Sequence, residues 1–183
     1  MKTLIDEDYK GNILGILNCL ILLRKLTNVQ DKNSGVEFLR SGILLYLEKY
    51  TDASLSDFPE IQQEACWIVS NVCSLENVDV LSLSNSKIIR NLVLLLKSQN
   101  KEVLLNAIWA LCNYSGDTID CRNKLLEFEG IFDCIYGLVL RLKNTEDPMY
   151  NPQILAEAIW LISNLLRKPY PPYKEVTHFL LLR

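Results

Sequence analysis

The feature that most constrains the fold is a tryptophan followed four residues later by an asparagine, because this pair occurs three times in one chain. The pairs are Trp67/Asn71, Trp109/Asn113 and Trp160/Asn164, and they contain every tryptophan of the 183 residues. The first two pairs lie 42 residues apart and the last two lie 51 apart. The polar, proline-containing stretch 143–152 accounts for the longer interval as a loop insertion. The sequence is therefore expected to consist of internal repeats.

Each repeat has the same internal order, in which a turn is followed by an apolar helix, a polar break and the helix that carries the pair. The first helices are expected at 43–50, 88–97 and 131–142, and the paired helices are expected to begin near Ile61, Glu102 and Pro152. A preceding unit has Ile21 and Lys25 at the Trp and Asn positions. A period near 42 lies in the HEAT/armadillo range of about 40–47 residues.

The fold class that follows is all-α, a right-handed α-solenoid of about four units in one domain, 1–183. The approximate units are 10–40, 41–84, 85–128 and 129–183, the last one incomplete. The apolar helices leave little room for a solvent-facing side, which stacked repeats would cover. No sustained alternation typical of β-strands competes with this interpretation.

The two ends of the chain carry separate expectations. The run 13–23 is the most apolar segment, but it is too short to span a bilayer and predicts a buried core helix. The polar, acidic stretch 1–11 does not have the pattern of a secretory signal, so a soluble protein is expected. Residues 178–183 resemble the start of another repeat helix, which suggests a fragment of a longer product or an end covered by a partner.

Charge and composition exclude several classes of function. A net charge of −3 argues against nucleic-acid binding. The six cysteines contain no CxxC spacing and are expected to be reduced, buried packing residues. With one histidine, His178, neither a metal site nor a cofactor is expected. The sequence contains no nucleophile elbow or P-loop, so an enzyme is not expected.

The chemistry of the repeated pair points to a ligand. Residues four apart lie on the same side of a helix, so stacked units would align three indoles and three amides. The stems of lysine and arginine pack on such rings, and their charges gain cation–π attraction of about 0.5–2 kcal/mol. Amides can bond an extended backbone. The residues three before each tryptophan, Glu64, Asn106 and Glu157, would join this surface, and the carboxylates among them would receive the cationic heads. The implied ligand is an extended Lys/Arg-rich peptide.

A structural role remains open for each of these residues. A single Trp-x3-Asn is usually a core tryptophan with a polar residue near a helix end, but three copies in one register favour a ligand. The Ser-Gly-Asp stretch 115–117 would break the helix, and Asp117 could simply be a turn or cap residue. Glu64 and Glu157 could be ordinary solvated carboxylates. Cys66 and Cys112 are interpreted as small packing residues.

Three segments of the sequence resemble the importin α (karyopherin α) family of armadillo-repeat adaptors. They are EIQQEACWIVSNVCS (60–74), EVLLNAIWALCNYSGDTIDCRNKLLEFEGI (102–131) and AEAIWLISNLLRKPYPPY (156–173). The run from Asn113 to Arg122 is the most diagnostic. The resemblance covers nearly the whole chain and implies a receptor for nuclear localisation signals in cytoplasm and nucleus, acting on cargo proteins and without membrane or nucleic-acid partners.

The resemblance also implies which residues bind. The family's major groove lies on the concave face of repeats two to four, which corresponds to the three Trp/Asn pairs. Asp117 stands where the family has the aspartate that receives the key signal lysine. Ser74 is a secondary groove candidate, although Leu75 follows it where the family has glycine. Gln30 replaces an acidic residue of the family's first repeat.

Two further expectations concern partners. The family's basic importin-β-binding segment has no counterpart in 1–11, so neither importin β binding nor self-inhibition is expected. The alternative function is a generic armadillo or HEAT scaffold of the catenin type, which typically presents a basic groove to acidic ligands. Glu64, Asp117 and Glu157 oppose that alternative.

Overall fold

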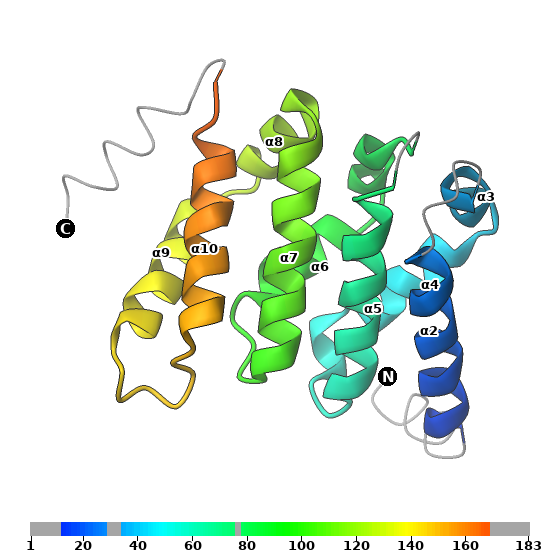
Figure 1. Cartoon of the computed structure of the whole chain (residues 1–183), viewed down its shortest axis with the longest axis horizontal. Coiled ribbons are helices and arrows are strands. Elements are labelled where there is room, and N and C mark those ends of the chain that lie inside the picture. The colour runs from blue at the N-terminus through cyan, green and yellow to red at the C-terminus, as the bar shows by residue number, and fades with distance from the viewer. Residues whose placement is uncertain (1–11, 29–33, 76–77, 169–183) are drawn as a thin grey trace.

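The computed structural model describes residues 12–28, 34–75 and 78–168, and every regular element in these ranges is a helix (Figure 1). The long and medium helices are α2 (Ile13–Thr27), α4 (Ile43–Tyr50), α5 (Pro59–Val72), α6 (Ile88–Leu95), α7 (Lys101–Asp117), α9 (Ile131–Lys143) and α10 (Pro152–Leu165). The short elements are α3 (Ser34–Arg40), α8 (Ile119–Leu126) and the 3-10 helices η1 (Ala53–Leu55) and η2 (Val80–Asn85).

The helices form two layers in a stack of repeats. Helices α2, α5, α7 and α10 stand side by side in the front row of Figure 1, and each contacts its neighbour in the row. Helices α4, α6 and α9 lie behind them, and α3 and α8 lie at one edge. Each complete repeat therefore contributes a short helix, a rear helix and a front helix. The predicted all-α solenoid is confirmed, and the unit boundaries at 41, 85 and 129 stay a prediction.

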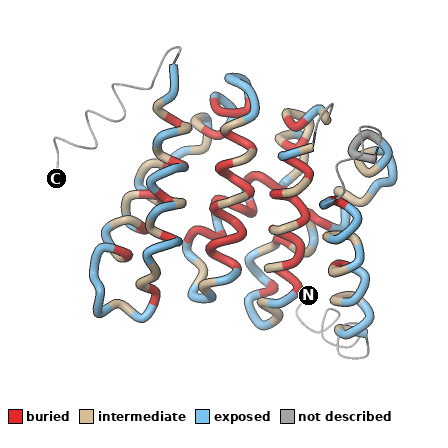
Figure 2. Tube along the Cα trace, in the orientation of Figure 1, coloured by how far each residue is buried: buried red, intermediate tan, exposed pale blue. Residues whose placement is uncertain are grey.

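Burial is concentrated in the middle of the stack. Figure 2 shows buried backbone mainly along α5, α6 and α7, where Leu92 and Ile108 are fully buried. Both of these residues lie on helices with a neighbouring repeat on either side. Ile159 of α10 is 53% exposed, although it stands at the position of Ile108. The core therefore comes from stacking, as expected for repeat proteins.

The prediction of a buried core helix at 13–23 is wrong. In α2 only Leu20 and Thr27 are buried, and Leu14 is 70% exposed. Helix α2 stays partly exposed because it stands at the end of the front row. Within the described ranges its only neighbour in that row is α5. Within the described residues, no helix combines the length and the apolar character needed to cross a bilayer.

The predicted helix starts agree closely with the structure. Helices α4, α6, α9 and α10 begin at the expected residues, and α7 begins one residue before Glu102. The expected break at 115–117 is wrong, because α7 continues to Asp117. Gly42 and Gly130 precede α4 and α9 with a φ of 77°, a left-handed conformation that glycine adopts without a Cβ clash.

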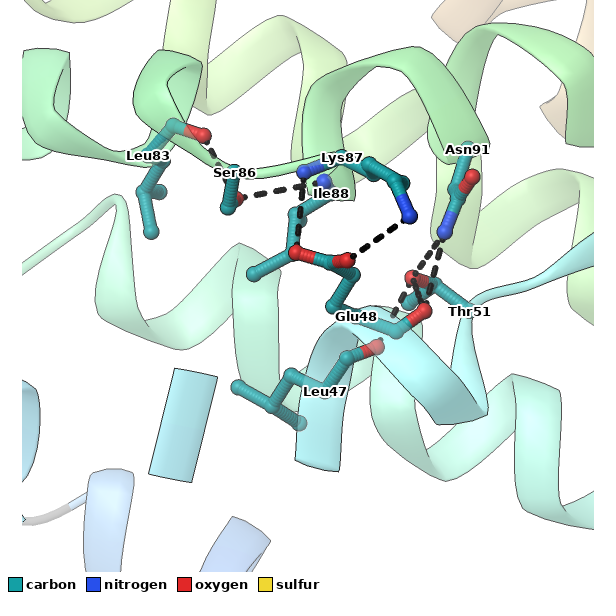
Figure 3. A network of polar contacts seen from close by, with 8 residues as sticks. All are labelled: Leu47, Glu48, Thr51, Leu83, Ser86, Lys87, Ile88 and Asn91. Atoms are coloured by element: carbon teal, nitrogen blue, oxygen red, sulfur yellow. Dashed lines mark hydrogen bonds and ion pairs between the residues drawn. The ribbon is translucent and has the colours of Figure 1, made fainter. Parts of the chain in front are cut away.

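A polar network joins two rear helices (Figure 3). The Asn91 amide of α6 donates to the backbone oxygen of Glu48 at 2.9 Å and to the Thr51 hydroxyl at 3.3 Å. The Glu48 carboxylate in turn accepts from the backbone N–H of Lys87 at 3.1 Å, and its other oxygen lies 3.6 Å from Lys87 Nζ. One asparagine thus fixes the register between consecutive repeats.

The expectations for 1–11, Gln30 and 178–183 lie outside the described residues.

Candidate functional site

The three Trp/Asn pairs occupy the same register in their helices. In α5, α7 and α10 the tryptophan is the ninth residue and the asparagine the thirteenth. Helix starts fix this register. Asn100 Oδ1 accepts from the backbone N–H groups of Glu102 and Val103 at 3.0 and 3.1 Å. Asn151 caps α10 in the same way, with Pro152 at the first helical position.

All three indoles reach solvent on the front row. Trp67 and Trp109 are partly exposed, and Trp160 is 48% exposed. A core residue of that size in the centre of the stack would be covered, as Tyr114 is. We call the side of the front row that carries these six residues the Trp/Asn face.

The asparagines connect each front helix to the one before it. Each asparagine Nδ2 donates to a backbone oxygen of the preceding front helix. The acceptor lies one residue before the position that corresponds to the asparagine in that helix. The bonds are Asn71 to Arg24 O at 3.3 Å, Asn113 to Ser70 O at 3.1 Å and Asn164 to Cys112 O at 2.9 Å. Hydroxyls strengthen the first two bonds: Asn71 also donates to Thr27 Oγ1 at 3.2 Å. Asn113 donates to Ser74 Oγ at 2.9 Å.

This connection gives the repeated asparagine a structural role, whereas its three copies in one register favoured a ligand role. Stacked repeats do need an amide at this place, because it bonds a backbone carbonyl near the end of the neighbouring helix. A ligand role remains compatible with it. Within the described ranges, no hydrogen bond reaches the Oδ1 atoms of Asn71, Asn113 or Asn164, so each can accept from a peptide N–H.

The first indole carries a cation from the chain itself. The guanidinium carbon of Arg24 lies 4.1 Å from the centroid of the Trp67 ring. Arg24 Nε donates to Glu64 Oε2 at 2.6 Å. Glu64 is only 8% exposed, so the idea of an ordinary solvated carboxylate is wrong for this residue. The repeat pattern assigned no role to Arg24. Lys25 stands at the asparagine position of the first unit, and the place of Arg24 directly before it is the signal that could have indicated a role.

The other residues three before a tryptophan differ from Glu64. Asn106 is 2% exposed and donates to Glu102 O at 2.8 Å. The expectation that it lies on the ligand-binding surface is therefore wrong. Glu157 is partly exposed. Among the described residues, the buried Asn106 Oδ1 and Glu157 Oε2 atoms have no hydrogen-bond partner.

Asp117 is the exposed last residue of α7. The helix-cap alternative does not hold for it, because Thr118 caps α8 by accepting from Cys121 N at 3.2 Å. The Cys121 thiol donates a hydrogen bond to Asp117 Oδ2 at 3.8 Å. Beside it, Arg167 donates to the oxygen of Gly116 at 2.8 Å. In the part of the chain that the structure describes, no ion pair neutralises the Asp117 carboxylate.

Four of the six cysteines are buried, whereas Cys19 is exposed and Cys134 is partly exposed. Cys66 and Cys112 are fully buried, which supports the packing interpretation, and burial raises the pKa of both thiols. Cys19 of α2 is exposed, contrary to the expectation of buried thiols. The described residues contain no cluster of three or more potential metal ligands.

Comparisons with known proteins find armadillo-repeat proteins among those similar to this chain. The family model of the Armadillo/beta-catenin-like repeat matches residues 82–116. Importin subunit alpha-3 of Arabidopsis thaliana is 32% identical over 158 residues, which cover 85% of this chain and 28% of that protein. Probable importin subunit alpha-A of Dictyostelium discoideum is 26% identical over 175 residues, 90% of this chain and 31% of that protein.

Solved structures give the same fold. A designed armadillo repeat protein in complex with the peptide (KR)4 is 25% identical, with a TM-score of 0.66 over 81% of this chain and 57% of that chain. Another designed armadillo repeat protein is 20% identical, with a TM-score of 0.72 over 88% of this chain and 63% of that chain.

The fold and the repeated register define an armadillo-repeat solenoid. The chain spans less than a third of the length of the curated relatives that it matches. Within that span its sequence is similar to importin α subunits, and residues 82–116 match the armadillo repeat.

Proposed function

We propose that this chain binds extended Lys/Arg-rich peptides, such as nuclear localisation signals, along the Trp/Asn face, and that it acts as an adaptor without catalysis. Its partners would be cargo proteins that carry such signals, in cytoplasm and nucleus. The importin α relatives support this proposal by similarity, and the designed relative was solved with a peptide of alternating lysine and arginine.

The observation that carries the proposal is the equal register of three solvent-reaching indoles. Trp109 and Trp160 are each the ninth residue of their helices, α7 and α10, which contact each other. The methylene stems of lysine or arginine can pack against such rings while the charge stays hydrated. The adjacent Asn113 and Asn164 offer their Oδ1 atoms to backbone N–H groups of the peptide.

Asp117 would provide the charge selectivity. It is exposed, unpaired among the described residues, and lies one turn beyond Asn113 on the same helix. A lysine ammonium at this carboxylate would gain a charge-assisted hydrogen bond. Ser74 and Glu157 are candidates for additional contacts at the edges of the face.

The test is a fluorescence-anisotropy titration of a labelled lysine-rich peptide against the full chain and matched variants. Asp117→Asn should weaken binding about tenfold, because a charge-assisted bond is lost. Asp120→Asn is the control, since it removes the same charge from an exposed residue of α8 and should change affinity less than about twofold. Trp160→Ala should also weaken binding, by about three- to thirtyfold.

Equal affinities of Asp117→Asn and Asp120→Asn would contradict the role of Asp117. A parallel titration with an acidic peptide of the same length tests the scaffold alternative. Tighter binding of the acidic peptide would overturn the proposal and favour a catenin-like scaffold.

A further inference from the structure

One of the three indoles is already engaged by a cation of the chain. Arg24 from α2 lies 4.1 Å over the ring of Trp67, and its Nε is 2.6 Å from Glu64 Oε2. Within the described residues, neither Trp109 nor Trp160 has a cation over its ring. The Trp/Asn face therefore has one occupied position and two open ones.

With its side chain, Arg24 makes the two contacts that the proposed function assigns to a basic side chain of the ligand, one with an indole and one with a carboxylate. Its backbone oxygen accepts a hydrogen bond from Asn71 at 3.3 Å, and its side chain stacks on the tryptophan of the same pair. The carboxylate of Glu64 completes the site. The cation on the indole and its carboxylate partner are therefore both supplied by the chain itself.

Displacement of Arg24 by a peptide is unfavourable for two reasons. The side chains of Arg24 and Glu64 are 24% and 11% exposed, so separating them would leave a mostly buried carboxylate without its partner. An intramolecular arginine also loses no translational freedom when it binds, whereas a peptide residue does.

We infer that Arg24 permanently occupies the basic side-chain position beside Trp67, so that a ligand peptide binds at Trp109, Asp117 and Trp160 and its basic run is limited to those positions. The inference rests on the proposed function and adds to it a residue that determines ligand length. Arg24 would be an internal substitute for one basic residue of the signal.

The test uses the three indole N–H signals in a ¹H–¹⁵N spectrum, assigned from single Trp→Phe variants. Titration of the wild-type chain with a lysine-rich peptide should shift the signals of Trp109 and Trp160 and leave that of Trp67 in place. In Arg24→Gln, which keeps a hydrogen-bond donor for Glu64, the Trp67 signal should move as well. Lys25→Gln is the matched control, because it removes a neighbouring exposed charge and should behave like wild type.

Affinity provides a second measurement. A peptide with five basic residues should bind Arg24→Gln about three- to tenfold more tightly than it binds Lys25→Gln, because one more cation–π contact becomes available. A peptide with three basic residues should bind both variants equally.

The outcomes separate the two proposals. If no indole signal moves in the wild-type chain, the proposed function fails and the inference fails with it. If Trp67 moves together with Trp109 and Trp160 in the wild-type chain, peptide binding stands and the inference is overturned. That comparison uses unmodified protein, so it holds even if Arg24→Gln is poorly folded.

Discussion

At the scale of single residues, the asparagines of the Trp/Asn face combine two roles. Their Nδ2 atoms bond the preceding helix, and their Oδ1 atoms have no partner within the described ranges. The same arrangement recurs in the rear layer, where Asn91 bonds a carbonyl and a threonine hydroxyl of α4. Asparagine suits this position because one amide both donates to a neighbouring helix and accepts from a ligand.

Replacing Asn113 should reduce stability as well as binding. Asn113→Ala removes donation to Ser70 O, Ser70 Oγ and Ser74 Oγ, and we expect a loss of about 1–3 kcal/mol in the free energy of unfolding. Urea denaturation measures this loss. Asn18→Ala is the control, because Asn18 is an exposed residue of α2 where alanine favours the helix. Equal stability of the two variants would contradict the structural role.

Thiol reactivity should follow burial. Burial raises the pKa of Cys66, Cys73 and Cys112, so these thiols hold less thiolate at pH 8 than an exposed cysteine does. We expect N-ethylmaleimide to modify Cys19 first in the native chain, as followed by peptide mass spectrometry. Modification of Cys66 at the rate of Cys19 would contradict the buried assignment. Denatured protein, in which all six thiols react alike, is the control.

At the scale of helices, the start positions explain why the three Trp/Asn pairs align. A capping asparagine or an initial proline marks the first residue of α5, α7 and α10, and the pair follows at a constant distance. The rear helices α4 and α9 begin after a glycine with a φ of 77°. Local signals thus set the register before any contact between repeats forms.

Two glycines near helix α9 should respond to alanine in opposite directions. Gly130→Ala forces a Cβ into a left-handed conformation and should destabilise the chain by about 1 kcal/mol. Gly137→Ala lies inside α9 with nothing within 4 Å of the new Cβ, and should stabilise it by about 1 kcal/mol. Thermal unfolding followed by circular dichroism compares them. A stabilising effect at Gly130 would contradict the observed backbone.

Sequence periodicity predicted the helices well because capping and apolar spacing are local properties. It predicted the starts of α4, α6, α9 and α10. It did not predict burial correctly where burial depends on contacts with neighbouring helices. Several residues of the apolar run 13–23 are exposed because, within the described ranges, α2 has a front-row neighbour on one side only, which hydrophobicity alone does not reveal. The ion pair of Arg24 with Glu64 joins residues 40 apart, so no local pattern indicated it.

At the scale of the whole molecule, burial falls from the middle of the stack to its two ends. Leu104 and Ile108 of α7 are fully buried, whereas Leu14 of α2 and Ile159 of α10 are mostly exposed. In a linear stack each repeat is stabilised by its neighbours, so the end helices have fewer stabilising contacts. The central helices therefore hold the Trp/Asn face in place.

Hydrogen exchange should reproduce this gradient. Amides of α5 and α7 should exchange slowest, and those of α2 and α10 fastest among the front helices, because terminal elements open locally at lower cost. Exchange followed by mass spectrometry on peptic peptides resolves these helices. Equal protection of α2 and α7 would contradict stabilisation by stacking.

The most direct measurement of the central claim is an experimental structure of this chain bound to a lysine-rich peptide. We expect the peptide to run along the front row, with a lysine ammonium at Asp117 and neighbouring basic side chains on Trp109 and Trp160. Arg24 should remain on Trp67. A peptide bound to the rear layer, or one that leaves Asp117 and both open indoles without contact, would contradict the account.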